Sequence, residues 1–335
     1  MAKINSTELK EQENNHNLGQ NFSYEKEIVK QDFPGVLGQE DVKHQLKSAI
    51  LVRRHVLIVG PPGIGKTTLV KSLANILPKR LVVDKKTGKE VLVDSVFVRV
   101  QGSPDLTAED LIGDIDPIKA IKFGPLSMEA FTPGKIFKAD GGILFFDEVN
   151  RCSEKLQNAL LQALEERKVT IGSYDVDLAA DFIFVGTMNP EESSTEPLSD
   201  VFLDRFDVIF MEPPNKQSVE EQIVLLKGKK LVEFSSELLS AMILFVRNLR
   251  ANDDLEKKPS VRASLGIYER AQSNAYLAGR TSVDMLDVQD ALISVLSHRI
   301  RLKPSLKYLK SATDYLREQF SEFCEQNNLA KGGSP

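Results

Sequence analysis

A glycine-rich run followed by a lysine and two threonines is the first part of the sequence that could do chemistry. Residues 60–68 are GPPGIGKTT, and Gly60, Gly65, Lys66 and Thr67 fit the spacing of a phosphate-binding loop. Glycines let backbone N–H groups surround a phosphate, and the start of a helix favours negative charge. Lys66 would reach the β- and γ-phosphates of a nucleotide, and Thr67 would hold Mg²⁺. The alternative is a glycine turn that binds nothing. The candidate nucleotide-binding residues of this loop are Gly60, Pro61, Pro62, Gly63, Ile64, Gly65, Lys66, Thr67 and Thr68.

Two adjacent acids follow an apolar run further along the chain. Residues 143–146 are all apolar, and Asp147 and Glu148 come directly after them. This pattern predicts a buried strand with charge at its carboxyl end, where ligands sit in open α/β sheets. Asp147 can then help to hold the Mg²⁺ of the loop, and Glu148 can orient the attacking water. Two acids with separate roles suit hydrolysis, although they could also begin a loop or cap a helix.

The elements that must position these residues are visible as apolar runs of strand length. Helical patterns or loops separate the runs, as in a parallel sheet covered by helices on both faces. The expected strands are Val56–Val59, Val91–Val100, Ile143–Phe146, Phe182–Val185 and Val208–Met211. A helix predicted over Thr67–Leu77 leaves the loop and stops at Pro78.

Composition is that of a globular protein with more than one domain. The chain has 335 residues, a formal net charge of -5, and only two cysteines, Cys152 and Cys324. A disulfide framework is therefore excluded, broad attraction to nucleic acid is disfavoured, and we expect a cytoplasmic protein without membrane insertion. Residues 1–32 and 326–335 are expected to be disordered polar tails, 33–214 a nucleotide-binding α/β domain, and 215–325 an α-helical domain. The helical patterns after Pro213-Pro214 lie near 216–228, 235–250, 262–278 and 284–299, with a weaker one after Pro304 and no strand-like run.

Three polar residues outside the two motifs are further candidates. Asn189 follows the strand predicted over 182–185, where an amide can contact both the γ-phosphate and water; it could instead cap the turn at Pro190. Arg205 precedes the last predicted strand, and Arg262 begins a helix of the second domain. A surface salt bridge and a solvated helix residue are the alternatives for these arginines. The Asn-Lys-x-Asp run of GTPases and the LSGGQ run of ABC proteins are missing.

Taken together, these motifs resemble those of AAA+ ATPases, specifically the MoxR group and the magnesium-chelatase ATPase subunit. The resemblance runs from about Phe33 to Arg301 and also includes the EERKVT run at 165–170. It implies a P-loop NTPase fold, in which a parallel sheet is sandwiched by helices, with a helix-2 insert and a pre-sensor-1 hairpin, followed by an all-α lid. The implied substrate and cofactor are ATP and Mg²⁺.

The resemblance also implies roles for individual residues. Glu148, Asn189, Arg205 and Arg262 would be the catalytic glutamate, sensor 1, arginine finger and sensor 2, and Asp147 and Thr67 would serve Mg²⁺. The family usually has Ser-Pro-Arg at the last position, whereas this chain has Ser260-Val261-Arg262. A finger that completes the neighbour's ATP site requires head-to-tail contacts, which close into a ring. The family implies a hexamer.

Two insertions distinguish this branch of the family. Residues 103–140 resemble the helix-2 insert, and residues 167–181 alternate around a turn as in a β-hairpin. The insertions carry aromatic and thioether side chains that could grip a polypeptide, or that could pack within the insert. They are Phe123, Met128, Phe131 and Tyr174.

The sequence thus favours an ATPase that remodels or activates a protein client. By resemblance to MoxR proteins, the partner would be a protein with a von Willebrand A domain, or the work would be metal or cofactor insertion. The open alternatives are a chelatase-type motor subunit, a DNA-dependent motor, which the acidic second half of the hairpin disfavours, and a nucleotide-gated scaffold with little turnover.

Overall fold

The computed structural model describes residues 28–77, 79–83, 89–124, 127–171, 176–190 and 198–329, in two compact units. The first unit runs to Met211, and the second begins at Glu212 and also takes in the short segments 37–39 and 61–64. Each unit has a hydrophobic core of its own. The limits 33–214 and 215–325 stay predictions, and the expected disorder of the tails falls largely outside the described residues.

A five-stranded parallel sheet forms the centre of the first unit. Its strands are β1 (His55–Val59), β4 (Phe97–Gln101), β7 (Ile143–Asp147), β10 (Ile183–Met188) and β11 (Phe206–Phe210). Their spatial order is β11-β1-β10-β7-β4, and every neighbouring pair is parallel. The predicted parallel α/β sheet is therefore confirmed. The carboxyl ends of β1, β7, β10 and β4 lie at one edge, where the glycine-rich loop, the acidic pair and Asn189 are found.

One predicted strand is wrong in its extent. Residues 91–100 do not form a single strand, because the polar Asp94 and Ser95 interrupt the run. Its first part is β3 (Glu90–Val93), which pairs antiparallel with β2 (Arg80–Val83) in a separate two-stranded ribbon. Only β4 joins the main sheet.

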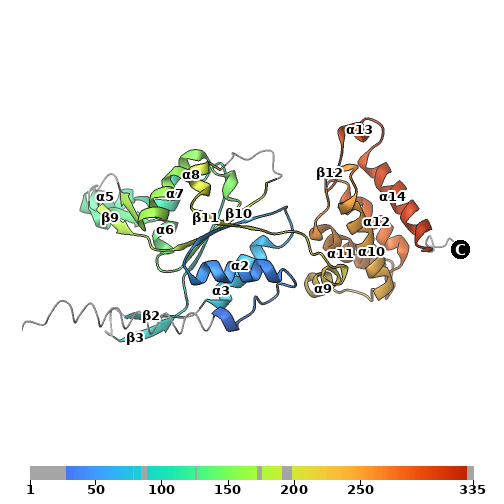
Figure 1. Ribbon diagram of the computed structural model, residues 1–335, viewed down its shortest axis with the longest axis horizontal. Coiled ribbons are helices and arrows are strands. Elements are labelled where there is room, and N and C mark those ends of the chain that lie inside the picture. The colour runs from blue at the N-terminus through green and yellow to red at the C-terminus, as the bar shows by residue number, and fades with distance from the viewer. Residues whose placement is uncertain are drawn as a thin grey trace, which may run out of the picture. The chain divides into compact units, whose positions relative to one another are not determined.

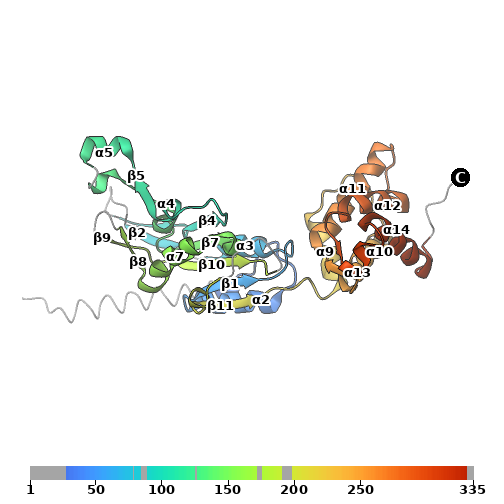
Figure 2. The same cartoon turned by 90° about the horizontal axis from the view of Figure 1, so that it is seen from above.

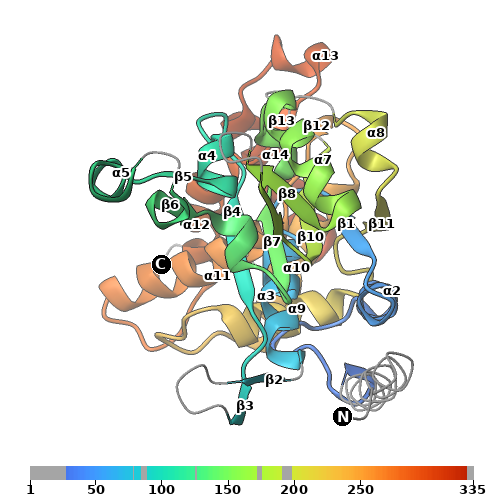
Figure 3. The same cartoon turned by 90° about the vertical axis from the view of Figure 1, so that its left-hand side faces the viewer.

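Helices cover both faces of this sheet, as Figures 1 and 3 show. The helices α2 (Glu40–Leu51) and α3 (Lys66–Ile76) lie on one face, and α7 (Glu154–Glu166) and α8 (Asp200–Leu203) lie on the other. Alternate residues of each strand serve the two faces, so that Leu57 and Val59 join the core beneath α7. This alternation explains why the strands are apolar throughout.

Residues 113–124 and 127–133 form an arm that extends from the sheet of its unit (Figure 2). It consists of β5 (Gly113–Ile115), α5 (Pro117–Phe123), the 3₁₀ turn η1 (Met128–Ala130) and β6 (Phe131–Pro133), flanked by α4 (Ala108–Ile112) and α6 (Lys135–Lys138). The two strands pair antiparallel. A second, predicted hairpin is confirmed as β8 (Lys168–Ile171) and β9 (Val176–Ala179), although Tyr174 lies outside the described residues.

The second unit is mainly helical, as predicted. Its helices are α9 (Gln217–Lys227), α10 (Ser236–Ala251), α11 (Val261–Leu277), α12 (Met285–Leu296), α13 (Pro304–Lys307) and α14 (Ala312–Gln326). A short antiparallel pair, β12 (Leu255–Lys257) with β13 (Arg301–Leu302), was not predicted, because two or three residues leave no periodic signal. No described helix of either unit is both long and apolar enough to span a membrane.

A buried ion cluster ties three helices of this unit together. The fully buried carboxylate of Glu220 on α9 accepts hydrogen bonds from Arg247, Arg250 and Ser264 on α10 and α11. Burial alone would raise the pKa of Glu220, but the hydrogen bonds and charge of Arg250, with the other two partners, lower it. The carboxylate therefore stays charged inside the helical unit.

Candidate active site

The glycine-rich loop connects β1 to α3, as the motif requires. Gly63 and Gly65 have positive φ angles of 76° and 105°, which favour glycine at these positions. Gly65 is the N-cap of α3, and Lys66 and Thr67 begin the helix. The Lys66 ammonium, whose residue is 9% exposed, donates to the carbonyl oxygen of Gly60 across the loop. Backbone N–H groups at this helix start suit an anion. Because the Ile64 side chain is a hydrocarbon, this residue could bind a phosphate only through its backbone N–H.

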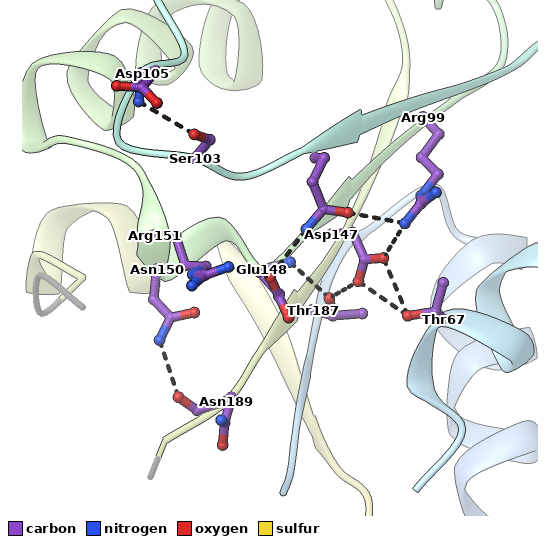
Figure 4. A network of polar contacts seen from close by, with 11 residues as sticks. Thr67, Arg99, Ser103, Asp105, Asp147, Glu148, Asn150, Arg151, Thr187 and Asn189 are labelled. Atoms are coloured by element: carbon purple, nitrogen blue, oxygen red, sulfur yellow. Dashed lines mark hydrogen bonds and ion pairs between the residues drawn. The ribbon is translucent and has the colours of Figure 1, made fainter. Parts of the chain in front are cut away.

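Thr67 and Asp147 lie in contact although 80 residues separate them. The Thr67 hydroxyl is 3.1 Å from both carboxylate oxygens of Asp147, whose side chain is 8% exposed at the end of β7. Figure 4 shows Asp147 joined to Thr67, Thr187 and Arg99 in a network of polar contacts. Hydroxyl and carboxylate oxygens are hard ligands, and Mg²⁺ in nucleotide sites commonly takes one or two from the protein. The pair therefore fits Mg²⁺.

The described residues offer no other obvious metal site. Nowhere in the described part of the chain do three His, Cys, Asp or Glu side chains gather as ligands would. Cys152 and Cys324 are both buried. A metal held jointly by Thr67, Asp147 and phosphate oxygens needs no such cluster.

Glu148 adopts a backbone conformation that is unusual for its type. Its φ and ψ are 59° and 54°, in the left-handed region, where non-glycine residues are uncommon and strained. Its carboxylate accepts from Gln101 Nε2 at 3.0 Å and from Arg151 Nη1 at 3.1 Å. The backbone turn thus directs the second acid away from the strand, and two donors orient it.

Three residues that the sequence did not indicate contact the acidic pair. The buried Thr187 donates to Asp147 Oδ1 at 2.7 Å and accepts from the Glu148 N–H at 2.9 Å. Arg99 on β4 donates to Asp147 Oδ2 at 2.7 Å. A Cβ on Gly102 would lie 2.0 Å from the Glu148 carbonyl oxygen, so only glycine allows this approach. The order β10-β7-β4 brings all three beside Asp147.

Asn189 follows β10 directly, at the same edge of the sheet. Its carbonyl oxygen accepts from Asn150 Nδ2 at 3.0 Å (Figure 4). Asn150 is 3% exposed, and its Oδ1 has no hydrogen-bond partner among the described residues. Asn150 therefore holds the backbone at Asn189, which follows the strand next to the one that carries the acidic pair.

Arg205 does not join this cluster. It lies between α8 and β11, and its guanidinium donates to Glu165 on α7 and to the Val201 carbonyl oxygen. Its side chain is 19% exposed, and its buried Nε has no partner in the described part of the chain. Within one chain, therefore, Arg205 forms a salt bridge with Glu165, which is the alternative to an arginine finger that the sequence left open. Arg262 is the exposed second residue of α11, in the helical unit.

Both units of the chain match known domain families. Residues 55–206 match the AAA domain family of the dynein-related subfamily, and residues 247–318 match the AAA lid domain family. The protein YeaC of Bacillus subtilis is 31% identical over 300 residues, covering 82% of this chain and 85% of YeaC. A magnesium-chelatase subunit ChlI homolog of Methanocaldococcus jannaschii is 30% identical over 348 residues, covering 88% and 92%. Chaperone MoxR1 of Mycobacterium tuberculosis is 27% identical, covering 80% and 73%.

Among solved structures, a RuvB mutant of Thermotoga maritima is similar with a TM-score of 0.52. The two sequences are 18% identical, and the similarity covers 88% of this chain and 83% of the other. At this identity the likeness concerns the fold alone.

Proposed function

The chain belongs to the AAA+ ATPases, in the branch of MoxR proteins and the magnesium-chelatase ATPase subunit, and from this premise we propose that it uses ATP hydrolysis to remodel or activate a protein client. It is an ATP hydrolase by family. The observation that carries the assignment of roles is the contact of Thr67 with Asp147, beside a Glu148 that the backbone turns outward.

Each residue at the sheet edge has a separate task in the proposed reaction. The loop N–H groups and Lys66 bind the phosphates, and Thr67 and Asp147 hold Mg²⁺, which when bound neutralises charge on the β- and γ-phosphates. Glu148 orients the attacking water in line with the γ-phosphate and polarises it. Asn189 contacts the γ-phosphate and that water. Arg262 is proposed as sensor 2 in the helical unit.

Arg205 is proposed to act on the ATP of a neighbouring subunit. A finger in trans requires a head-to-tail interface, and a closed rotation of such interfaces gives a ring, proposed to be a hexamer. Two features support a role beyond the Glu165 pair. The Arg205 Nε has no hydrogen-bond partner among the residues that the structure describes, and an unsatisfied buried donor costs about 1–3 kcal/mol. Arg205 also lies two residues after α8, in the Leu203-Asp204-Arg205-Phe206 run that resembles the finger motif of the family.

The tip of the arm is the proposed site of contact with the client. Helix α5 has no buried residue, and its Ile118 and Ile121 are 80% and 89% exposed. Phe123 and Met128 beside them are 49% and 41% exposed, whereas Phe131 is buried and packs edge-on against Phe137. Phe131 therefore packs within the insert and is not available to grip a polypeptide. The exposed tip supports a role in holding apolar polypeptide, since such side chains gain from burial.

The identity of the client rests on resemblance. A protein with a von Willebrand A domain is the proposed partner, as for MoxR proteins, and metal or cofactor insertion is the proposed alternative task. A chelatase-type motor and a DNA-dependent motor share the same hydrolytic site and differ only in what stimulates it. Turnover that rises with DNA and falls steeply with salt would favour the latter.

The test of the proposed function uses two variants with opposite effects. Lys66→Ala should lose nucleotide binding or turnover, whereas Glu148→Gln should bind ATP and hydrolyse it very slowly. Glu148→Gln with ATP should then retain a client from cell extract that ADP releases, and a version with Ile118 and Ile121 changed to Ser should not retain it. Wild-type turnover by Glu148→Gln would refute the assignment of the water-orienting acid.

A further inference from the structure

The buried carboxylate of Glu220 fixes the plane of one arginine side chain in the helical unit. Arg250 on α10 meets it as a fork, with Nη1 3.0 Å from Oε2 and Nη2 3.0 Å from Oε1. Two parallel hydrogen bonds of this kind define the orientation of a guanidinium. The side chains of Arg250 and Glu220 are 14% and 0% exposed, so that water hardly competes for the fork.

The third donor of Arg250 points at the start of another helix. Its Nε donates to the carbonyl oxygen of the buried Pro259 at 2.9 Å, three residues before Arg262. Because the fork fixes the guanidinium plane, it also fixes the direction in which Nε donates. Beyond Arg262, the Ser264 hydroxyl donates to Glu220 Oε1 at 2.7 Å. The same carboxylate therefore holds the chain on both sides of Arg262.

The first turn of α11 contributes little of its own to the position of Arg262. The side chain of the N-cap residue Ser260 makes no capping hydrogen bond within the described residues. The first helical position is Val261, and valine, unlike proline, does not fix the backbone angle φ. Arg262 follows with an exposed side chain, at the end of the helix whose dipole opposes a cation. The contacts of Arg250 and Ser264 are thus what holds this segment.

We propose that Arg250 is a positioning residue, which holds the start of α11 so that Arg262 can contact the phosphates of bound ATP. This inference rests on the proposed function of Arg262 as sensor 2. Arg250→Lys keeps a charge beside Glu220 but removes the fork and the Nε donor, because a lysine ammonium is a point charge. Arg247 and Ser264 still donate to Glu220, so that the buried carboxylate stays compensated.

The experiment measures the KM for ATP and the thermal midpoint of each variant. Arg250→Lys should raise the KM about 3- to 30-fold, within the range of coupling between residues of one hydrogen-bond network. Arg262→Met should raise it at least as much, and the double variant should add little, because both changes remove the same contact.

Arg280→Lys is the matched control for damage to the helical unit. Arg280 makes an equivalent fork onto the buried Asp287, just beyond the other end of α11. This variant should lower the thermal midpoint about as much as Arg250→Lys does, while its KM for ATP stays at the wild-type value.

A proline provides a second way to fix the start of α11. Ser260 has an extended backbone, with φ −94° and ψ 177°, which a residue before proline can adopt. Val261→Pro should therefore be accepted at the first helical position, and alone it should leave the KM unchanged. Added to Arg250→Lys, it should bring the KM back toward wild type, because it restores the position of Arg262 without the Arg250 contact.

Four results would overturn the inference about Arg250. They are a wild-type KM in Arg250→Lys, an equal rise of KM in Arg280→Lys, losses in the double variant with Arg262→Met that multiply, and no recovery when Val261→Pro is added. If instead Arg262→Met itself kept the wild-type KM, the proposed sensor 2 would fail as well. The two failures are distinguishable, because only the second is seen when Arg262 alone is changed.

Discussion

Replacing Glu165 with glutamine should make Arg205 a better trans-acting residue. Within one chain, Arg205 on the segment between α8 and β11 is paired with Glu165 on α7. Action on a neighbouring ATP requires this pair to open. Glu165→Gln removes the charge that holds the guanidinium but keeps the size of the side chain, so that opening becomes easier.

The size of the effect follows from the exposure of the pair. The Glu165 side chain is 56% exposed and that of Arg205 is 19% exposed, so solvent screens the attraction. Pairs of this kind contribute about 0.2–1 kcal/mol. If all of that free energy is recovered in the engaged state, turnover rises by about 1.5- to 5-fold. Loss of the arginine itself should lower turnover by ~10³–10⁵.

The assay is steady-state ATP turnover over a range of protein concentrations. Glu166→Gln is the matched control, because Glu166 is the exposed neighbour on the same helix and accepts from Gln162 rather than from an arginine. It should behave as wild type. A fall in Glu165→Gln to the level of Arg205→Ala, or no change at all, would refute the idea that the pair restrains Arg205.

The remaining predictions concern stability. Glu220→Ala should destabilise the helical unit by about 3–5 kcal/mol, because it leaves Arg247 and Arg250 without their buried partner, and Glu221→Ala should melt like wild type. The protein should become less stable as the pH falls below 6.5, the ordinary pKa of a histidine. Burial lowers the pKa of His55 in the folded protein, so the unfolded chain takes up the proton first. His55→Asn, which keeps an acceptor for the Phe184 N–H, should flatten that slope in melting curves between about pH 5 and 8.

Local patterns were enough to predict the loop, the acidic pair and the sheet. The glycine spacing of 60–65 and the apolar run before Asp147 are properties of a few consecutive residues. They predict the same turn and strand wherever the rest of the chain lies. The helices α9 to α12 were likewise predicted from periodicity to within a few residues of their ends, whereas the weaker pattern expected after Pro304 corresponds to two helices, α13 and α14.

The partners of the acids could not be predicted, because they come from neighbouring strands that are distant in sequence. Arg99, Gly102 and Thr187 reach Asp147 and Glu148 only because β4 and β10 flank β7. The apolar runs do not specify that order. The end of β10 was missed for a similar reason: Thr187 pairs with Ile58 in the ladder, which extends the strand beyond Val185. Thr187 was visible in sequence as a polar residue within a strand end, which is the signal that could have selected it.

Mixing two inactive variants tests the central claim most directly, namely that each ATP is cleaved with an arginine from the next subunit. Lys66→Ala should lack a working nucleotide site but carry an intact Arg205, and Arg205→Ala should have the reverse defect. We expect turnover to reappear when the two proteins are combined and to depend on their ratio, because mixed interfaces join an intact site to an intact finger. Turnover that stays at the level of the separate variants, in assemblies shown to contain both, would contradict the proposed role of Arg205.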